Sequence, residues 1–227
     1  MFYTLKDLNF KKFFLKTKKE VVFNPNLFFI ELKKFYENKN KKLLDNFEKK
    51  NNGLELANTR SNLLDQIISK CYNYYFFELK KNSKNFRCSI VATGGFGRKE
   101  LAPYSDIDIL FLYSLKSKKD LEDFVKFVLH TLWNLGLKVG YATRTPKECI
   151  LYSKKNLDVC TFILESRFIT GDKTIYESLT KQYKNNIIER YRKKFIKSIF
   201  SERKKRLIET GDTRYLLDQM LKTEKVV

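Results

Sequence analysis

One stretch, residues 90–113 (IVATGGFGRKELAPYSDIDILFLY), constrains the fold of this chain more than any other. Two apolar runs flank a glycine pair, Gly94 and Gly95, and a short polar link. A link of this length cannot hold the helical crossover that parallel neighbours need, so the two runs are predicted to be antiparallel or angled strands. The later order of helix and then strand therefore favours a small mixed sheet over a doubly wound one.

Two aspartates, Asp106 and Asp108, open the second apolar run. On a strand this spacing points both carboxylates to one face, which is unfavourable unless a cation lies between them. Mg²⁺ is commonly held by one or two carboxylates together with substrate phosphates. Glycines at 94 and 95 can adopt φ > 0 and let backbone N–H groups approach a phosphate closely.

Each of these signals is weak alone, because a bare D-x-D is most often a solvated strand end. Together, on consecutive strands, they predict nucleotidyl transfer. Two metal ions about 3.5–4 Å apart could clamp the attacking and leaving oxygens of an in-line displacement.

The remaining chain reads mainly as helix around this sheet, which predicts an α+β fold with helical N- and C-terminal extensions. Residues 1–25 are expected to form an irregular arm or a short helix. We expect an N-terminal helical arm at 1–57, a nucleotidyltransferase core at 58–172 and a C-terminal helical region at 173–227. Hydrophobic periodicity and turn residues predict helices at 27–50, 58–81, 118–135 (capped by Ser117), from Pro146, 157–169 and 174–209, one helical turn at 98–102, and strands at 86–93, 106–113 and 137–145.

The chain is strongly basic, with 46 Lys and Arg against 26 Asp and Glu among 227 residues and a net charge of +20. This charge could attract nucleic acid, nucleotide or an acidic partner. It could equally reflect a biased composition, because Lys, Asn, Phe and Ile are abundant throughout and the basic residues form no single cluster. No nucleic-acid-binding module is recognisable, so nucleic acid is not expected as a partner.

Cysteine and histidine usage narrows the chemistry further. The four cysteines form no C-x-x-C pair and nothing resembles a secretory signal, which predicts reduced thiols and a cytoplasmic location. No apolar run is long enough to span a membrane. The lone histidine, His130, lies in a helical pattern and is expected on a helix surface or in the core. One histidine excludes multi-histidine metal sites and makes a Ser–His or Cys–His nucleophile unattractive.

The stretch GGFGRKELAPYSDIDIL resembles the DNA-polymerase-beta-like nucleotidyltransferases, and more closely the family of PII uridylyltransferases, whose pattern is GGYGRGELxPYSDIDLL. LWNLGLKVGYATRTPKEC is similar to that family's LWDxGLEVGHSVRTxEEC, and TFILESRFITGD to its TxLLEARLLxGD. The similarity runs from about residue 60 to 217.

The resemblance implies transfer of a uridylyl group from UTP to a tyrosine hydroxyl of the signalling protein PII, with two Mg²⁺ ions and release of pyrophosphate. Gly94 and Gly95 would hold the triphosphate, and Asp106 and Asp108 would bind the metals. Arg98, Lys99 and Arg144 are candidates for phosphate contact, with structural salt bridges as the alternative. Ser105 could orient the metal strand or simply cap its start.

The third carboxylate usual in the superfamily is less evident. The third strand places Tyr141 where the acid is expected, and a tyrosine cannot replace a carboxylate. Glu165 and Asp158 are the alternatives, and Glu165 is preferred because it lies in the matching LESR motif. The competing interpretation of Glu165 is a salt bridge to Arg167 or to another helix.

The end of the chain departs from the family. After GDTRYLL the family continues EPNVKEGKGGLRD, whereas residues 218–227 read DQMLKTEKVV. A single-base deletion in the Glu codon would account for this change, a hypothesis that resequencing the gene tests. The family's His- and Asp-rich hydrolase domain has no counterpart in these 227 residues, and with a single histidine they are not expected to carry out the uridylyl-removing reaction. The alternatives to an active uridylyltransferase are a truncated remnant that binds nucleotide or PII, and a protein adenylyltransferase.

Overall fold

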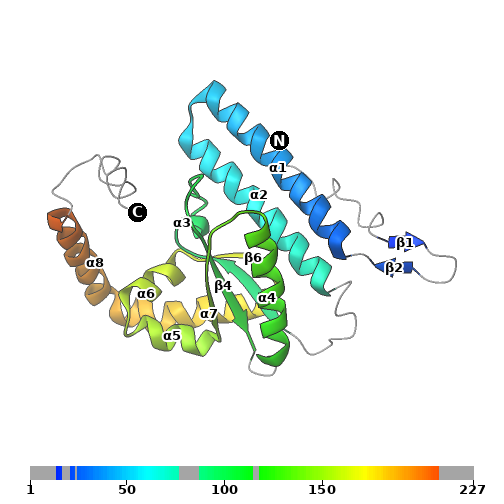
Figure 1. Ribbon diagram of the computed structural model, residues 1–227. Coiled ribbons are helices and arrows are strands. Elements are labelled where there is room, and N and C mark those ends of the chain that lie inside the picture. Colours follow the sequence, from blue (N-terminus) through cyan, green and yellow to red (C-terminus); the bar gives the residue numbers. More distant parts are fainter. Residues whose placement is uncertain (1–13, 17–20, 24, 77–86, 115–117, 210–227) are drawn as a thin grey trace.

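A four-stranded mixed sheet lies at the centre of the computed structural model, in the order β5–β4–β3–β6 (Figure 1). β3 (Cys88–Ala92) pairs antiparallel with β4 (Ile107–Tyr113) and with β6 (Arg167–Gly171), and β4 pairs parallel with β5 (Val139–Arg144). The antiparallel β3–β4 pair and the small mixed sheet confirm the predictions. The structure describes residues 14–16, 21–23, 25–76, 87–114 and 118–209.

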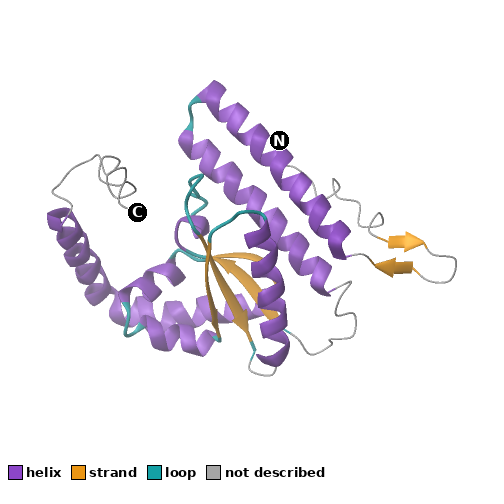
Figure 2. Ribbon diagram, in the orientation of Figure 1, coloured by secondary structure: helices purple, strands orange, loops and turns teal. Residues whose placement is uncertain are grey.

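Helices cover both faces of this sheet (Figure 2). In the described residues they are α1 (Pro25–Lys50), α2 (Gly53–Tyr74), α3 (Gly94–Gly97), α4 (Lys118–Asn134), α5 (Pro146–Ser153), α6 (Leu157–Leu164), α7 (Lys173–Tyr183), a π-helical turn (Lys184–Ile188) and α8 (Glu189–Glu209). The α+β class with helical extensions is thereby confirmed. The helix expected from residue 58 already begins at Gly53, because the side chain of Asn52 accepts a hydrogen bond from the Glu55 N–H at 3.1 Å and caps it.

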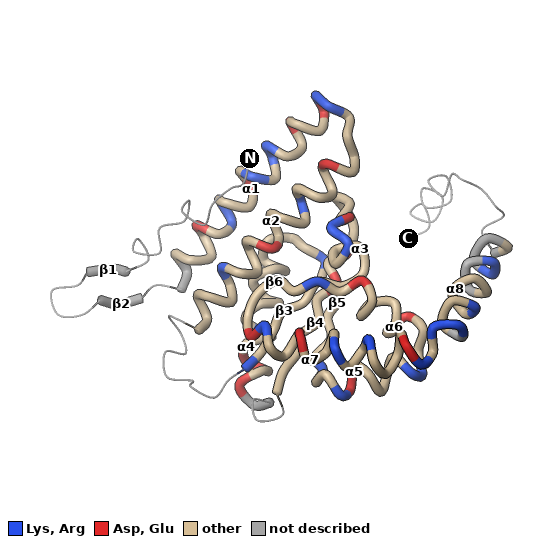
Figure 3. Tube along the Cα trace, turned by 180° about the vertical axis from the view of Figure 1, so that it is seen from behind, with Lys and Arg blue, Asp and Glu red and all other residues tan. Residues whose placement is uncertain are grey.

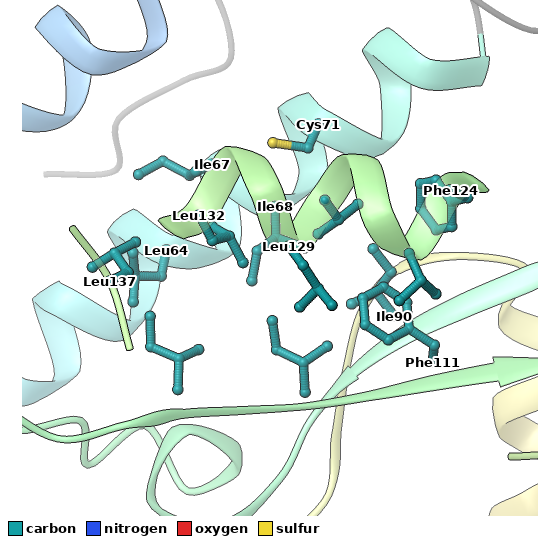
Figure 4. Close-up of a cluster of buried hydrophobic side chains, with 14 of the residues drawn as sticks. Leu64, Ile67, Ile68, Cys71, Ile90, Phe111, Phe124, Leu129, Leu132 and Leu137 are labelled. Atoms are coloured by element: carbon teal, nitrogen blue, oxygen red, sulfur yellow. The ribbon is translucent and has the colours of Figure 1, made fainter. Parts of the chain in front are cut away.

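The larger core fills the space between α2, α4 and one face of the sheet (Figure 4). Leu64 and Ile68 of α2 and Leu129 and Leu132 of α4 are buried there. Stacked aromatic rings extend this core to α1, where the ring centroids of Phe28 and Tyr74 lie 3.9 Å apart. The buried apolar side chains of α2 are therefore packing surface for the sheet and for α4.

A second core lies on the opposite face of the sheet, under α5, α6 and α7. β4 contributes to both cores, because alternate residues point to opposite faces: Ile107 and Ile109 belong to the first core, and Leu110 and Leu112 to the second. Asp108 has the same parity as Leu110. The carboxylate of Asp108 thus lies near the start of a strand that is buried on both faces, at a position where an apolar residue would be expected.

Two predictions for the core region are wrong. The helix expected at 157–169 ends at Leu164, and Arg167–Gly171 forms the edge strand β6 instead. The run ILESRFI has helical spacing, but pairing with the free edge of β3 overrides it. The helical turn expected at 98–102 is also misplaced, because the turn is α3, which begins at the glycine pair itself.

At the N-terminus, β1 (Phe14–Lys16) and β2 (Val21–Phe23) pair antiparallel, where an irregular arm or short helix was expected. The Ser117 cap and residues 218–227, for which a single-base deletion is the hypothesis, lie outside the described residues. The helix expected from Pro146 is confirmed as α5, and Thr145 caps it: the Thr145 hydroxyl accepts from the Glu148 N–H at 3.2 Å, and Glu148 accepts from the Thr145 N–H.

The remaining sequence features have simple outcomes. All four cysteines are free and buried, and burial raises the pKa of the Cys71 and Cys149 thiols to about 12. His130 is exposed on α4. No helix in the described part of the chain is both long and apolar enough to cross a membrane. Lys and Arg residues are scattered along α1, around α3 and along α8 in Figure 3.

Candidate functional site

The carboxylate of Asp108 lies between two glycines from different elements. A Cβ at Gly94 would come within 3.1 Å of Oδ2 of Asp108, and a Cβ at Gly140 would come within 2.7 Å of Oδ1. Gly140 is also the direct partner of Asp108 in the parallel β4–β5 register. The structure therefore brings Gly94 of the glycine pair and the second aspartate together, as the sequence predicts, and packs the carboxylate closely against glycine backbone on both sides.

Asp106 lies just before β4 and is exposed, whereas Asp108 is half-buried. Burial raises the pKa of Asp108 above its ordinary value of 3.8, and the neighbouring charge of Asp106 raises it further. Neither carboxylate has an ion-pair or hydrogen-bond partner among the described residues. Two like charges without a compensating cation are the arrangement that hard divalent metals stabilise.

The glycine-rich turn α3 follows β3 directly and is closed by its own backbone. Gly94 has φ +57°, a conformation that favours glycine, and its carbonyl accepts from the Arg98 N–H at 3.1 Å. A Cβ at Gly97 would lie 2.1 Å from the carbonyl oxygen of Glu165, so only glycine fits where the end of α6 touches the turn. The glycines of GGFG therefore have two roles, because Gly94 allows the backbone conformation of the turn and Gly97 allows its close packing against α6.

Arg167 of β6 fixes this turn to α2. Its guanidinium donates to both carboxylate oxygens of Asp65, at 2.7 and 3.1 Å, and to the backbone carbonyls of Phe96 and Gly97, at 3.1 and 3.2 Å. It also lies over the Phe96 ring, 5.5 Å from the centroid. Sequence reasoning missed Asp65 altogether and considered Arg167 only as a partner of Glu165; the observed partner is Asp65.

Arg98 and Glu165 form an ion pair beside the turn. Nη1 of Arg98 lies 2.7 Å from Oε2 of Glu165, and its Nε donates to Glu100 at 2.8 Å. The hydrogen bond to Glu100, with the charge of Glu165, raises the pKa of Arg98 above its ordinary value. The structure thus places Arg98 in salt bridges with Glu100 and Glu165. A structural salt bridge was the alternative to phosphate contact for Arg98.

Glu165 does not join the two aspartates in a three-carboxylate cluster. Among the described residues, no group of three or more His, Cys, Asp or Glu side chains is arranged to hold a metal ion. Asp158, the other alternative, lies in the exposed first turn of α6. A catalytic role for Glu165 stays a prediction.

The third-strand position that faces Asp108 is Gly140, and Tyr141 was the wrong choice. Tyr141 pairs with Ile109, so it belongs to the opposite face of the sheet, and its side chain is 53% exposed. Arg144 lies four residues beyond Gly140, roughly 13 Å along the strand, and its guanidinium is 4.9 Å from the centroid of the Tyr152 ring. The structure therefore does not bring Arg144 to the aspartates.

Ser105 and Lys99 lie on the link between the glycine turn and β4. Ser105 is exposed directly ahead of Asp106, and its N–H donates to the Ala102 carbonyl at 3.2 Å. Lys99 has φ +62°, a left-handed conformation that is costly for a side chain, at the place where the family pattern has glycine. Its Nζ donates to Oδ1 of Asn62 at 3.0 Å, which ties the link to α2.

Two substitutions of Lys99 distinguish the cost of its left-handed backbone from the contribution of its hydrogen bond to Asn62. Lys99→Gly and Lys99→Ala both lose the bond to Asn62, but only glycine relieves the left-handed strain. We expect Lys99→Gly to be more stable than Lys99→Ala by about 1 kcal/mol, measured by urea unfolding. Equal stability of the two variants would show that this position carries no strain.

Phe162 is an aromatic neighbour of the site that sequence reasoning missed. It projects from α6 with 43% of its surface exposed, and its ring edge lies 4.0 Å from the place of a Cβ on Gly94. The run VCTFIL is apolar apart from Thr161, so nothing in its pattern sets Phe162 apart. An exposed aromatic ring beside a glycine-rich turn is suited to stacking on a flat ligand such as a nucleobase.

Comparisons with known proteins agree with this geometry. Residues 77–207 match the family model described as a nucleotidyltransferase domain. The bifunctional uridylyltransferase/uridylyl-removing enzyme of Caulobacter vibrioides (strain NA1000 / CB15N) is 34% identical over 176 residues, which are 76% of this chain and 19% of that enzyme. The enzymes of the same name from Rhodospirillum rubrum and Rhodopseudomonas palustris are 33% identical over 78% and 36% identical over 71% of this chain. The chain spans about a fifth of the length of these curated relatives.

Proposed function

Because the chain belongs to the nucleotidyltransferase domain family, we propose that it transfers a uridylyl group from UTP to a tyrosine hydroxyl of the PII signalling protein. The observation that carries the proposal is the Asp108 carboxylate, held between Gly94 of the glycine turn and Gly140 of β5 with Asp106 beside it. General nucleotidyl transfer rests on the family. The choice of UTP and PII rests on the resemblance of the motifs and on the named activity of the relatives.

The residues present fit a divalent metal. Asp106 and Asp108 offer hard oxygen ligands and have no cation among the described residues to offset their repulsion. Magnesium bound there, as two ions in the proposed mechanism, would neutralise the charge of the triphosphate and of the leaving group. Because the chain offers no third carboxylate at Gly140, the two aspartates would hold the metal together with the substrate phosphates.

The reaction is an in-line displacement. The tyrosine oxygen forms a bond to the α-phosphorus, the bond from that phosphorus to the bridging oxygen of the β-phosphate breaks, and pyrophosphate leaves with the electron pair while the tyrosine proton passes to solvent. Such a transfer depends mainly on positioning and charge neutralisation. The open backbone at Gly94 and Gly95 would bind the triphosphate, and Phe162 would offer its exposed ring to the base.

The test incubates the 227-residue chain with Mg²⁺, PII and UTP or ATP labelled in the α-phosphate. We expect label on PII from UTP only, and none on PII whose acceptor tyrosine is replaced by phenylalanine. Label from ATP alone would make the chain a protein adenylyltransferase. Nucleotide binding without transfer from either nucleotide, in folded protein, would identify a remnant and contradict the proposal.

A further inference from the structure

A cavity of about 290 Å³ lies between α1, α2 and the link that leads into β4. Its lining includes Arg60 and Lys138 but no acidic residue. Tyr36 and Leu137, which belong to the larger core, form part of its wall, so the cavity lies on the sheet face opposite to that of Asp108. It is therefore separate from the site between Gly94 and Gly140.

Arg60 is the unusual feature of this cavity. Its side chain is 93% buried, since only 7% is exposed, yet no carboxylate pairs with it among the described residues. Its Nη1 donates to Oδ1 of Asn40 at 3.2 Å, and its buried Nε has no hydrogen-bond partner. A guanidinium is always charged, and burying that charge without an anion is unfavourable. The described residues thus leave the charge of Arg60 without an anion and its Nε without a hydrogen-bond acceptor.

We propose that this cavity binds a small oxyanion, a carboxylate or a phosphate, through Arg60. The planar fork of a guanidinium matches both groups, because each presents two oxygens to two parallel N–H donors. Lys138 adds a second positive charge, and the Ser105 hydroxyl and Asn40 amide add neutral donors. The volume is at the small end of the roughly 300–1,000 Å³ of small-ligand sites, which suits a compact anion.

The position of the cavity links it to the metal-bearing strand. Ser105 lines it and directly precedes Asp106. The carbonyl of Lys138, also at its rim, accepts from the N–H of Ile107 at 2.9 Å. An anion held by Arg60 and Ser105 would therefore steady the segment that carries Asp106, from the far side of the sheet.

The experiment measures anion binding without nucleotide or Mg²⁺. The melting temperature of the full chain is recorded against sodium phosphate and sodium acetate, with ionic strength held constant by sodium chloride. We expect a saturable rise with phosphate, acetate or both, and affinity that falls roughly tenfold or more in Arg60→Met. The two salts distinguish a phosphate ligand from a carboxylate ligand.

Arg190→Met is the matched control, because it makes the same change of charge on the exposed surface of α8 and should respond like the unaltered chain. Asp108→Asn should also respond normally, so failure of the proposed catalysis leaves this test intact. A double variant, Ser105→Ala with Lys138→Ala, should weaken binding even if Arg60→Met does not fold. No rise beyond chloride, or equal responses of Arg60→Met and Arg190→Met, would overturn the proposal.

Discussion

Asp108→Asn is expected to reduce nucleotidyl transfer on the order of 10³-fold in kcat, and Asp106→Asn to act in the same direction. Asparagine preserves the shape of the side chain but removes the charge that would hold a divalent metal. Metal stabilisation of the transition state is worth several kcal/mol, and each 1.36 kcal/mol is about tenfold in rate. The label on PII in the UTP assay gives the measurement.

The same variant should gain stability when no metal is present. Ionised Asp108 is half-buried and repelled by Asp106, so its folded-state pKa is raised. For an acid with a raised pKa, the folded state binds more protons than the unfolded state, and stability falls as pH rises above the ordinary value of 3.8. Asp108→Asn does not lose stability in this way. Its free energy of unfolding should therefore exceed that of the unaltered chain at neutral pH, and the difference should disappear as pH falls through the raised pKa of Asp108.

Asp45→Asn is a suitable control for both measurements, because Asp45 is an exposed acid on α1. It should change neither transfer nor stability appreciably. Retention of more than a tenth of the transfer by Asp108→Asn would contradict the proposed role of this carboxylate. A loss of stability at neutral pH would show that Asp108 serves the fold rather than a metal.

The centre of the site was predictable because its signals are local. The glycine pair, the short link and the D-x-D spacing fix the hairpin-like β3–β4 pair and bring Gly94 to Asp108. The antiparallel pairing of β3 and β4 followed from the length of their connection. The helices around the sheet followed from apolar periodicity and from start residues such as Pro146.

The parts that were not predictable depend on contacts distant in sequence. Residues 165–169 continue a helical pattern, and only the open edge of β3 makes Arg167–Gly171 a strand. The choice of Tyr141 over Gly140 failed because a shift of one residue in register moves a side chain to the other face. The partner of Arg167 is separated from it by 102 residues, which no local pattern reveals.

Arg167→Met is expected to destabilise the chain by about 2–4 kcal/mol, the second large effect. The substitution keeps an apolar stem over Phe96 but removes the paired hydrogen bonds to Asp65 and the bonds to the carbonyls of Phe96 and Gly97. Breaking an ion pair that is largely removed from water leaves the partner charge uncompensated, which costs more than an exposed pair is worth. Urea unfolding at neutral pH measures the loss.

Arg87→Met provides the comparison. Arg87 also pairs with an aspartate, Asp172, but its side chain is 56% exposed, against 24% for Arg167. Exposed pairs contribute about 0–1 kcal/mol, so Arg87→Met should cost far less. Equal costs for the two variants would mean that burial and the carbonyl contacts of Arg167 add nothing.

The pH dependence identifies the charge left behind. Burial raises the pKa of Asp65 above 3.8, and Arg167 opposes that rise through its hydrogen bond and its charge. Removing Arg167 should raise this pKa further. The variant should then take up a proton on folding over a wider pH range, and its free energy of unfolding should fall as pH rises through that range. The difference between the variant and the unaltered chain should therefore shrink as pH falls toward 3.8, and adding Asp65→Asn should recover part of the loss at neutral pH. A pH-independent difference, or no recovery in the double variant, would show that Arg167 acts on the glycine turn alone and not through Asp65.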